Sequence, residues 1–516
     1  STTFSFTYDP CAPQYGDPYY HYPMRYSSTT DTIIVWGDDG SGTNCGQTGD
    51  GSCYQMGASP NNPITFEDIY QFGVAVRGQC AVKKPASGSY AILTNLQVGT
   101  SSIPVYLKTS GESINFGKRI VLKNGATMTS GEISATGTPY GGSTLSCSGT
   151  SSDTGGQFYL ESGSNLDLYD SVLLHKSTPT STDPSFSLDW YGQTTIKRSS
   201  LEKWWNIKFL SATNSVEDLV IVNVGQGFYP GVTQSASTTF NIIKSRKTIE
   251  SGLYATGSAS FTVKNLLIEE TTGTDIYISN YDGTAQVVNS ELDWSSMSWN
   301  GSGSGQINRV YTFRVRVVNS LGNPIPNAHV ILQDIDSNKV IDEYTDSNGY
   351  ISEHLITTDV YDYAHQSGST KNPHSLSITA SGYYDYSQTL PISSALDFTV
   401  VMSKACQPDG TVRNYPMRYT TTTEGREILY VWGDDGSGTN CGQNGNATCT
   451  PMGYDVDHPI TFEQMREFAN SVRQDCIIER PAEGSYAILT ELQIGTSSIP
   501  TYVKTGSESI TFAQQL

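Results

Sequence analysis

The sequence has few charged residues and no long apolar run. Asp, Glu, Lys and Arg together make up 16% of the 516 residues. No stretch approaches the roughly 18 consecutive apolar residues that suggest a membrane-spanning helix. The 30 Lys and Arg residues against 50 Asp and Glu give a formal net charge of −20. Nucleic acids and anionic membranes are bound through clustered cations, so this balance argues against both partners. An acidic surface attracts divalent cations, which keeps calcium as a candidate ligand.

Several common functional motifs are also missing. The sequence contains no Gly-x-Ser-x-Gly, no P-loop, no Cys-x-x-Cys and no Cys-x-x-Cys-His. These absences argue against an α/β-hydrolase nucleophile, a P-loop nucleotide site, a common structural zinc site and a c-type haem. The chain opens at Ser1 without Met or a signal peptide, which we interpret as the mature form of a processed protein.

One stretch of the chain occurs twice. Tyr22-Pro-Met-Arg-Tyr returns at Tyr415, and the twelve residues that begin at Trp36 return unchanged at Trp432. The similarity continues to Phe116 and Phe512, mostly at a spacing of 396 residues. Two copies of a joint between repeating units would explain this arrangement better than two copies of an active site. The chain would then be one full period plus a fragment of the next.

Eight of the nine cysteines form two quartets, and Cys147 is left over. Each quartet allows three pairings. We favour the pairs Cys11–Cys80, Cys45–Cys53, Cys406–Cys476 and Cys441–Cys449. Closing the short loop would stabilise by roughly 2.6 kcal/mol and the long loop by roughly 4.4 kcal/mol in the chain-entropy model. Disulfides indicate an oxidising compartment, so we expect an extracellular or cell-surface location.

The repeated stretch is predicted to form a small α+β module. Residues 1–10 alternate apolar and polar side chains, as a half-buried strand does. Residues 11–113 form the first copy of the module, with strands expected over 33–36, 90–96 and 105–108. Thr65-Phe-Glu-Asp and Thr461-Phe-Glu-Gln are capping boxes that open a helix. The apolar stripe from Phe66 reaches Cys80, which places Cys80 on the buried helix face.

Residues 114–300 contain short strands separated by Gly, Asn and Ser turns, recurring every 20 to 30 residues. Clear examples are residues 164–174, 193–201, 260–268 and 285–292. This pattern resembles the right-handed parallel β-helix of pectate-lyase-like and archaeal surface proteins. The resemblance implies a stiff rod, in which each coil is buried only by its neighbours.

Residues 300–305 read as a flexible Gly-Ser linker. After it, the alternating strand at 311–318, the turn Gly322-Asn-Pro-Ile-Pro and Thr345-Asp-Ser-Asn-Gly resemble a carboxypeptidase-regulatory-like (transthyretin-like) domain. The resemblance implies an Ig-like β-sandwich over residues 306–404, serving as a spacer or adhesive module. Residues 405–516 are the second disulfide module, which runs into an incomplete rung of β-helix. The predicted fold class is therefore mainly β and multidomain.

Candidate chemistry is sparse, and each candidate has a structural alternative. A polysaccharide lyase or hydrolase would use acidic and basic side chains on the rod, for which the candidates are Asp167, Asp170, Asp189, His175, Lys197 and Arg198. Two copies of a loop offer oxygen ligands for calcium, namely Asp38, Asp39, Asn44, Asp434, Asp435 and Asn440. Asx turns pinned by the neighbouring disulfide are the interpretation of those loops that we prefer. We assign no catalytic residue, and calcium is the one cofactor that we consider.

The remaining candidates concern the surface of the protein. Trp204 and Trp205 could stack on sugars, and Asn300 and Asn446 begin glycosylation sequons. Cys147 is expected to be a buried thiol. We expect a non-enzymatic structural subunit of an extracellular filament, sheath or surface array. It would assemble head to tail as a homopolymer or form part of a tandem-repeat polypeptide. The alternatives are a carbohydrate-binding adhesin or viral spike on surface glycans, and a polysaccharide lyase.

Overall fold

The protein is mainly β-structure. The computed structural model describes residues 9–13, 21–49, 51–100, 104–149, 156–179, 186–231, 238–496 and 500–514. Residues 1–8 of the predicted N-terminal strand lie outside the described residues. The chain divides into two compact units. The first holds residues 1–312, 355–372 and 392–395, and the second holds residues 313–354, 373–391 and 396–516. Neither helix among the described residues is long and apolar enough to cross a bilayer.

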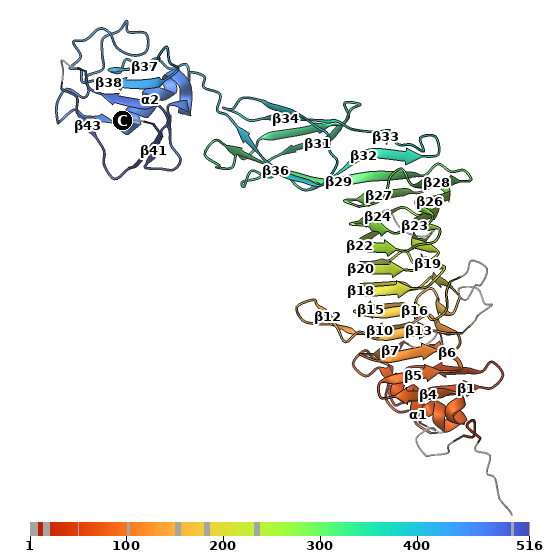
Figure 1. The fold of residues 1–516 in the computed structure, drawn as a ribbon. Helices are drawn as coiled ribbons and strands as arrows, with labels where there is room; N and C mark the ends of the chain where they lie inside the picture. Colours follow the sequence, from red (N-terminus) through yellow and green to blue (C-terminus); the bar gives the residue numbers. More distant parts are fainter. Residues whose placement is uncertain are drawn as a thin grey trace, which may run out of the picture. The chain divides into compact units, whose positions relative to one another are not determined.

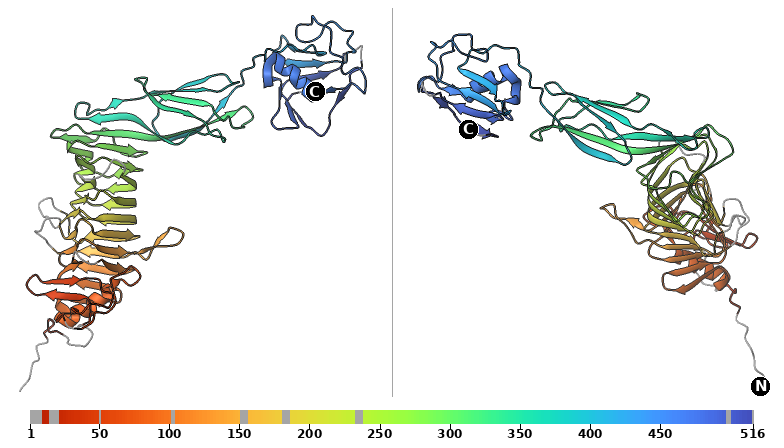
Figure 2. Two further views of the ribbon diagram at one scale, coloured as in Figure 1. Left: turned by 180° about the vertical axis from the view of Figure 1, so that it is seen from behind. Right: turned by 45° about the horizontal axis from the view of Figure 1, so that its top comes forward.

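The first unit contains a parallel β-helix, whose successive coils stack strand on strand (Figures 1 and 2). One wall is an eleven-stranded sheet in which only the first pair of strands is antiparallel. Its strands in spatial order are β1 (Met24–Ser27), β2 (Thr32–Val35), β6 (Asn95–Val98), β9 (Ile120–Leu122), β14 (Phe158–Leu160), β17 (Ser187–Trp190), β19 (Asn206–Phe209), β21 (Gln226–Pro230), β23 (Ser251–Gly257), β26 (Thr274–Tyr281) and β28 (Met297–Asn300).

The other walls of the β-helix belong to a second large sheet. One column of this sheet stacks β3 (Ile64–Thr65), β7 (Val105–Thr109), β10 (Ala126–Ser130), β15 (Asn165–Tyr169), β18 (Gln193–Glu202), β20 (Asn214–Val222), β22 (Thr239–Arg246), β24 (Phe261–Lys264), β27 (Thr284–Val288) and β29 (Gln306–Asn319). The adjacent column holds β4 (Val82–Ala86), β5 (Ser89–Ile92), β8 (Ser113–Phe116), β13 (Thr144–Cys147), β16 (Val172–His175) and β25 (Leu267–Glu269). β11 (Glu132–Ile133) and β12 (Pro139–Tyr140) form a separate hairpin.

Aromatic side chains fill part of the β-helix core from coil to coil. Phe116 contacts Phe158, Phe158 contacts Trp190, and Trp190 contacts Phe209, with ring centroids 5.9, 6.4 and 5.7 Å apart. All four rings are at most 1% exposed. Each ring packs against the next coil, which is why a single coil could not bury its own core.

The corners of the coils use single residues with a left-handed backbone. Arg198, Asp218 and Ile242 have φ of 48°, 54° and 54°, and they lie at equivalent places in β18, β20 and β22. Asn265 and Asn289 continue the series at 55° and 49°. Asn and Asp tolerate this conformation, whereas a β-branched residue such as Ile is rarely found in it. The series lets one strand turn a corner without losing its register.

The Gly-Ser segment at residues 300–305 is part of the stack. The backbone N–H of Ser304 donates to Asp282 Oδ1 at 2.8 Å, and that of Gly305 donates to the carbonyl of Tyr281 at 2.9 Å. A Cβ on Gly303 would lie 2.0 Å from the carbonyl oxygen of Tyr281. Glycine is therefore required here for close packing, and the prediction of a flexible linker was wrong.

The second unit begins with residues of β29 from Phe313 onward. This part of β29 pairs in parallel with β36 (Leu396–Met402). Next to it in the chain is an antiparallel sheet in the order β31 (Lys339–Tyr344), β30 (His329–Gln333), β34 (His374–Thr379) and β35 (Tyr386–Leu390). β32 (His354–Asp362) pairs with β33 (Ser369–Thr370), and both lie in the first unit apart from His354. Whether residues 306–404 form a carboxypeptidase-regulatory-like domain stays a prediction.

The rest of the second unit contains the second disulfide module. Its elements are β37 (Met417–Thr421), β38 (Glu427–Val431), β39 (Ile460–Thr461), α2 (Phe462–Arg473), a 3₁₀ turn at Gln474–Cys476, β40 (Ile478–Glu479), β41 (Ser485–Ile488), β42 (Glu491–Ile494), β43 (Val503–Lys504) and β44 (Ser509–Phe512). In the first module, α1 (Phe66–Arg77) is followed by a 3₁₀ turn at Gly78–Cys80. Both capping boxes are present, with Thr65 and Thr461 as the N-caps. Cys80 lies beyond the helix, so its predicted place on the helix face was wrong.

Candidate assembly interface

Each module is closed by two disulfides. The structure contains Cys11–Cys80 and Cys45–Cys53 in the first copy. It contains Cys406–Cys476 and Cys441–Cys449 in the second copy. These are the pairs that the sequence favours. The long bridge ties the start of the module to the 3₁₀ turn after its helix, and the short bridge closes a Gly-rich loop.

The two modules have separate cores with the same arrangement of side chains. The first buries Met24, Ile33, Val35, Ile69 and Phe72, and the second buries Met417, Leu429, Val431, Met465 and Phe468. Corresponding side chains in the two lists occupy the same strands and the same turns of the helix. The repeat seen in the sequence is therefore a repeat of packing as well.

Three strands of the first module act as the base on which the β-helix stacks. β6, β7 and β8 form a rung that pairs in parallel with β2, β3 and β5. The next coil, made of β9, β10 and β13, then pairs in parallel with that rung. Backbone bonds cross this junction from Lys123 N–H to the Val98 carbonyl at 2.9 Å and from Ser148 N–H to the Phe116 carbonyl at 3.0 Å. Module and rod are thus one continuous stack.

The second module builds the same rung in the same register. Ile428 pairs with Glu491 as Thr32 pairs with Asn95, and Ser485 pairs with Ser509 as Ser89 pairs with Ser113. The third pairing, β39 with β43, also matches β3 with β7. Every one of these positions is shifted by 396 residues. The second module therefore presents the base of a β-helix.

The outer side of this second rung is exposed. β42, β43 and β44 are all edge strands among the described residues. Ile494 and Phe512 are each 40% exposed, whereas their counterparts Val98 and Phe116 are 0% and 1% exposed. Fully burying one such side chain is worth about 1.5–3 kcal/mol. Open parallel edges next to apolar side chains form a template for further strands.

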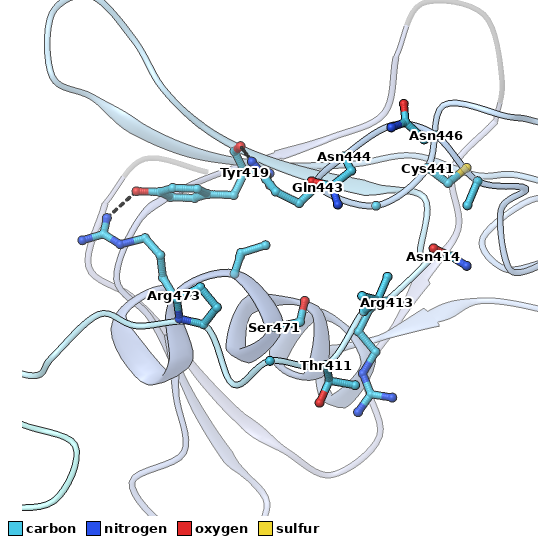
Figure 3. Close-up of a pocket in the computed structure, with 16 residues that line it drawn as sticks. Thr411, Arg413, Asn414, Tyr419, Cys441, Gln443, Asn444, Asn446, Ser471 and Arg473 are labelled. Carbon is cyan, nitrogen blue, oxygen red and sulfur yellow. Dashed lines mark hydrogen bonds between the residues drawn. The ribbon is translucent and has the colours of Figure 1, made fainter.

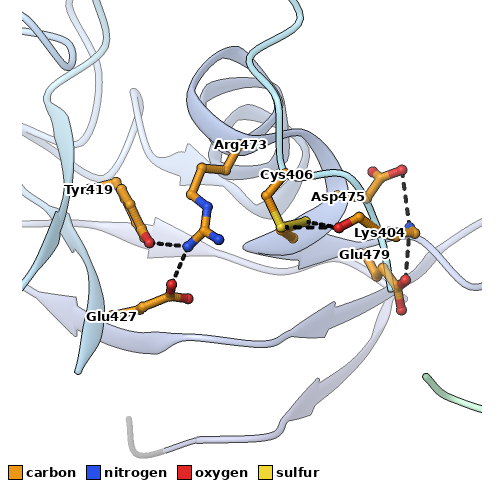
Figure 4. Close-up of a disulfide and its surroundings, with 8 residues drawn as sticks. Lys404, Cys406, Tyr419, Glu427, Arg473, Asp475 and Glu479 are labelled. Atoms are coloured by element: carbon orange, nitrogen blue, oxygen red, sulfur yellow. Dashed lines mark hydrogen bonds and ion pairs between the residues drawn. A yellow bond between two sulfur atoms is a disulfide. The ribbon is translucent and has the colours of Figure 1, made fainter. Parts of the chain in front are cut away.

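An ion pair at the entry to the second module distinguishes it from the first. Lys404 Nζ lies 2.7 Å from Glu479 and 3.3 Å from Asp475, beside the Cys406–Cys476 bridge (Figure 4). Burial opposes the charge of Lys404, but the hydrogen bond that Lys404 donates to Glu479 and the nearby charge of Asp475 outweigh it and raise the pKa of Lys404. The corresponding residues of the first module are Asp9 and Lys83, so the charges are reversed there.

A second charged group links helix and strands in both modules. Arg77 donates to Asp31 at 2.9 Å and also to the hydroxyl of Tyr26. In the second module, Arg473 donates to Glu427 and to the hydroxyl of Tyr419 (Figure 4). Although burial opposes the charge of Arg473, its hydrogen bonds to Glu427 and Tyr419 raise its pKa. These contacts hold the C-terminal end of each helix against the β-hairpin of its module.

The predicted calcium loops are organised by Asx turns. Asp38 Oδ1 accepts from the backbone N–H groups of Gly40 and Gly42 at 2.7 and 3.3 Å. Asp434 repeats both contacts with Gly436 and Gly438 at 2.8 and 3.2 Å. The outer carboxylates behave alike, because Asp39 and Asp435 each accept from a serine N–H at 3.0 Å. Asp38 and Asp434 also approach sulfur atoms that are already joined in disulfides. Calcium at Asp38, Asp39, Asn44, Asp434, Asp435 and Asn440 stays a prediction.

A cavity of about 560 Å³ opens in the second module and is lined by helix α2, by the segment at residues 410–414 and by residues 441–444 and 446–447 of the facing loop (Figure 3). Arg413, Asn444, Asn446 and Arg473 are among its lining residues. Arg473 is engaged by Glu427 and Tyr419. Asn446, the residue of the second sequon, is exposed at this cavity. Asn300, the residue of the first sequon, ends β28 and donates from Nδ2 to the Tyr277 hydroxyl at 2.9 Å. Glycosylation of either residue stays a prediction.

The enzyme candidates on the rod do not form one cluster. Asp170 and Arg198 pair at 3.2 Å, while Lys197 pairs with Glu217 at 3.5 Å and Asp189 pairs with Lys208 at 3.0 Å. Asp189 lies on a different sheet from the others. His175 is 2% exposed and packs against Phe186 and Trp204. Asp167 accepts from Asn165 Nδ2 at 3.1 Å, and burial raises its pKa.

The predicted sugar platform at Trp204 and Trp205 does not exist as an exposed pair. Trp204 is fully buried, and its Nε1–H donates to the Leu173 carbonyl at 3.3 Å. The outer aromatic feature is a ladder of Tyr229, Tyr254 and Tyr277, with centroid spacings of 4.6 and 5.1 Å. Each ring of the ladder packs against the next ring, so the ring faces contact one another. Its signal in the sequence is Tyr recurring once per coil, which was missed.

Cys147 lies inside the core of the β-helix. It is 0% exposed and is the one free cysteine among the described residues. Burial raises the pKa of its thiol, which disfavours the reactive thiolate. The residue is therefore a core side chain of β13.

Comparisons with known proteins identify no family. No family model and no curated protein matches the chain. Among solved structures, the crystal structure of the periplasmic alginate epimerase AlgG matches 54% of this chain and 73% of its own, at 9% identity and a TM-score of 0.24. A double mutant of the same epimerase matches with the same values. A likeness of this size carries no inference about activity.

Proposed function

We propose that the protein is a non-enzymatic structural subunit of an extracellular filament, sheath or surface array. The repeated disulfide module is the joint between successive rods, and the β-helix is the stiff part of each link. In this proposal the β-helix is right-handed, and residues 306–404 form a carboxypeptidase-regulatory-like β-sandwich that spaces one joint from the next.

The observation that carries the proposal is the second rung. The strands β42, β43 and β44 repeat the register of β6, β7 and β8, yet Ile494 and Phe512 lie on an exposed side. A linear repeating structure needs a base for a rod at each joint, and each of the two modules offers such a base. Contacts of this head-to-tail kind do not close on themselves, so they generate open assemblies.

The disulfides and the acidic surface fit an extracellular setting. Each module is closed by two disulfide bridges, and such bridges persist in oxidising compartments. A net charge of −20 favours solubility of the exposed faces over nonspecific association.

Electron microscopy of the native material tests the proposal directly. We expect filaments or a regular array with a repeat that contains one module and one rod. Discrete, non-associating particles in the native material would contradict it. Retained filaments after high salt, but loss of filaments after combined reductant and mild denaturant, would assign the joint to the disulfide module.

A further inference from the structure

The exposed face of β42, β43 and β44 has a defined shape and chemistry. It offers three parallel strand edges around the apolar side chains Ile494 and Phe512. In the first module the equivalent face is covered by the coil of β9, β10 and β13. There Phe116 packs on Phe158 at 5.9 Å, while Phe512 contacts only Phe462 among the described aromatic rings, at 6.4 Å.

The face therefore selects its occupant by register as well as by apolar character. Leu96 pairs with Ile120 and Val98 with Leu122, so an occupant of the second face must bring equivalent residues opposite Leu492 and Ile494. The backbone N–H of Leu96 donates to the carbonyl of Arg119 at 2.9 Å, which fixes the same bond for Leu492. A coil like residues 117–149 meets all of these requirements.

A separate folded copy of the protein cannot offer that coil. In a folded copy the coil of β9, β10 and β13 is already covered by its own β6, β7 and β8. Docking would require the incoming copy to release its first disulfide module. Releasing it would expose Phe116 and Val98, which are 1% and 0% exposed. Simple collision between folded subunits is thus the disfavoured way to cover the face.

We propose that a second copy of the rod covers the face of β42, β43 and β44. This copy has the sequence features of residues 117–149, and it is continuous in the chain with Phe512. The inference rests on the proposed function, because it names the partner of the same joint. It chooses a tandem polypeptide over head-to-tail docking of separate folded subunits. The joint is then a covalent passage from module to rod, as it is at Phe116 and Gly117.

The test is a longer chain in which a copy of residues 117–404 directly follows Phe512. Hydrogen exchange followed by mass spectrometry compares β42 and β44 in this chain and in the 516-residue chain. We expect exchange of the Leu492 amide and of the β44 amides to slow by about a hundredfold or more in the longer chain. We expect no change in the 516-residue chain between low and high protein concentration.

A matched variant controls for trivial effects of added length. In the appended copy only, Ile120→Asp and Leu122→Asp place charges where the incoming coil meets Leu492 and Ile494. This variant should lose the protection of β42 and β44, while α2 and the original rod keep theirs. If the appended rod is itself protected but β42 and β44 still exchange freely, the proposal is wrong.

Concentration-dependent protection of the 516-residue chain would also overturn it. Sedimentation would then tell a two-fold dimer of identical faces from a chain of docked subunits. The two proposals fail separately in these experiments. Native filaments together with an unprotected longer chain would refute only the proposal that a second rod covers β42, β43 and β44. Native monomers together with a protected longer chain would refute only the proposal that the protein forms a filament.

Discussion

Lys404 Nζ lies 2.7 Å from the carboxylate of Glu479, whose side chain is 6% exposed. The first module places Asp9 and Lys83 at these positions, so the signs of the two charges are exchanged between copies. If the segment before one module were paired with the other module, like charges would meet. In the second module the pair therefore ties the module to the segment that precedes it.

The first prediction concerns this pair. Glu479→Lys should lower the free energy of unfolding of the second module by about 2 kcal/mol, because it leaves Lys404 half-buried beside a like charge. The double variant Lys404→Glu, Glu479→Lys should recover most of that loss, although Asp475 then faces a carboxylate. Hydrogen exchange of α2 in urea measures the change. Lys339→Gln, which breaks an exposed pair with Asp342, serves as the control and should cost under about 0.5 kcal/mol. Equal losses in the single and double variants would contradict the assignment.

The second prediction compares the two disulfides of the first module. Cys11→Ser with Cys80→Ser opens a loop with a sequence separation of 69, and Cys45→Ser with Cys53→Ser opens one of 8. In the chain-entropy model the losses are roughly 4.4 and roughly 2.6 kcal/mol. Exchange of the α1 amides reports both. A larger loss from the short loop would show that strain or packing, and not loop closure, dominates these bridges.

The third prediction concerns Trp204 and Trp205. Trp204→Ala should destabilise the rod by about 3–5 kcal/mol, because it empties a fully buried site. Trp205→Ala should cost clearly less, because Trp205 is only partly buried. Thermal unfolding of the two variants measures the difference. Unchanged stability of the Trp204 variant, with loss of binding on a glycan array, would instead support a carbohydrate-binding role.

The fourth prediction concerns Asp167 and pH. Burial raises its pKa in the folded protein above that in the unfolded chain, so the folded state holds the proton more tightly. The contribution of Asp167 to stability is then fully present below the unfolded pKa and is lost as pH rises through the folded pKa. The stability of the Asp167→Asn variant relative to the native protein should therefore increase when the pH is raised from 3 to 7. Urea unfolding at both pH values checks the sign, and the opposite sign would mean that Asn165 and its neighbours stabilise the carboxylate.

The fifth prediction concerns Ile242, which turns a corner of the β-helix at φ 54°. Ile242→Asn should stabilise the rod by about 1 kcal/mol, because Asn tolerates the left-handed region that a β-branched residue resists. Asn265 and Asn289 already occupy equivalent corners. The matched change Ile243→Asn, one position along and fully buried, should destabilise strongly. Loss of stability in the Ile242 variant would show that its side chain contributes more by packing than its backbone costs.

The sequence predicted those features that depend on local patterns. The capping boxes at Thr65 and Thr461 predicted where both helices begin, and the cysteine spacing predicted the favoured bridges. It failed at residues 300–305, because glycines that allow close backbone packing have the same composition as a flexible linker. It also failed at Trp204, because this residue lies in the turn between β18 and β19, where no alternating pattern reveals which side of the coil a side chain occupies. The sequence also predicted an incomplete rung at the end of the second module. The exposure of its outer side required the structure, since Phe116 and Phe512 are the same residue type and differ only in exposure.

The long bridges also determine how a linear assembly would respond to tension. A force applied along the chain passes directly from Cys11 to Cys80 and from Cys406 to Cys476, bypassing the residues between them. A segment of 69 residues could otherwise lengthen by about 240 Å when pulled straight. The part of each module inside its long bridge therefore cannot lengthen, and any stretch must come from segments outside these bridges, such as the coils of the rod.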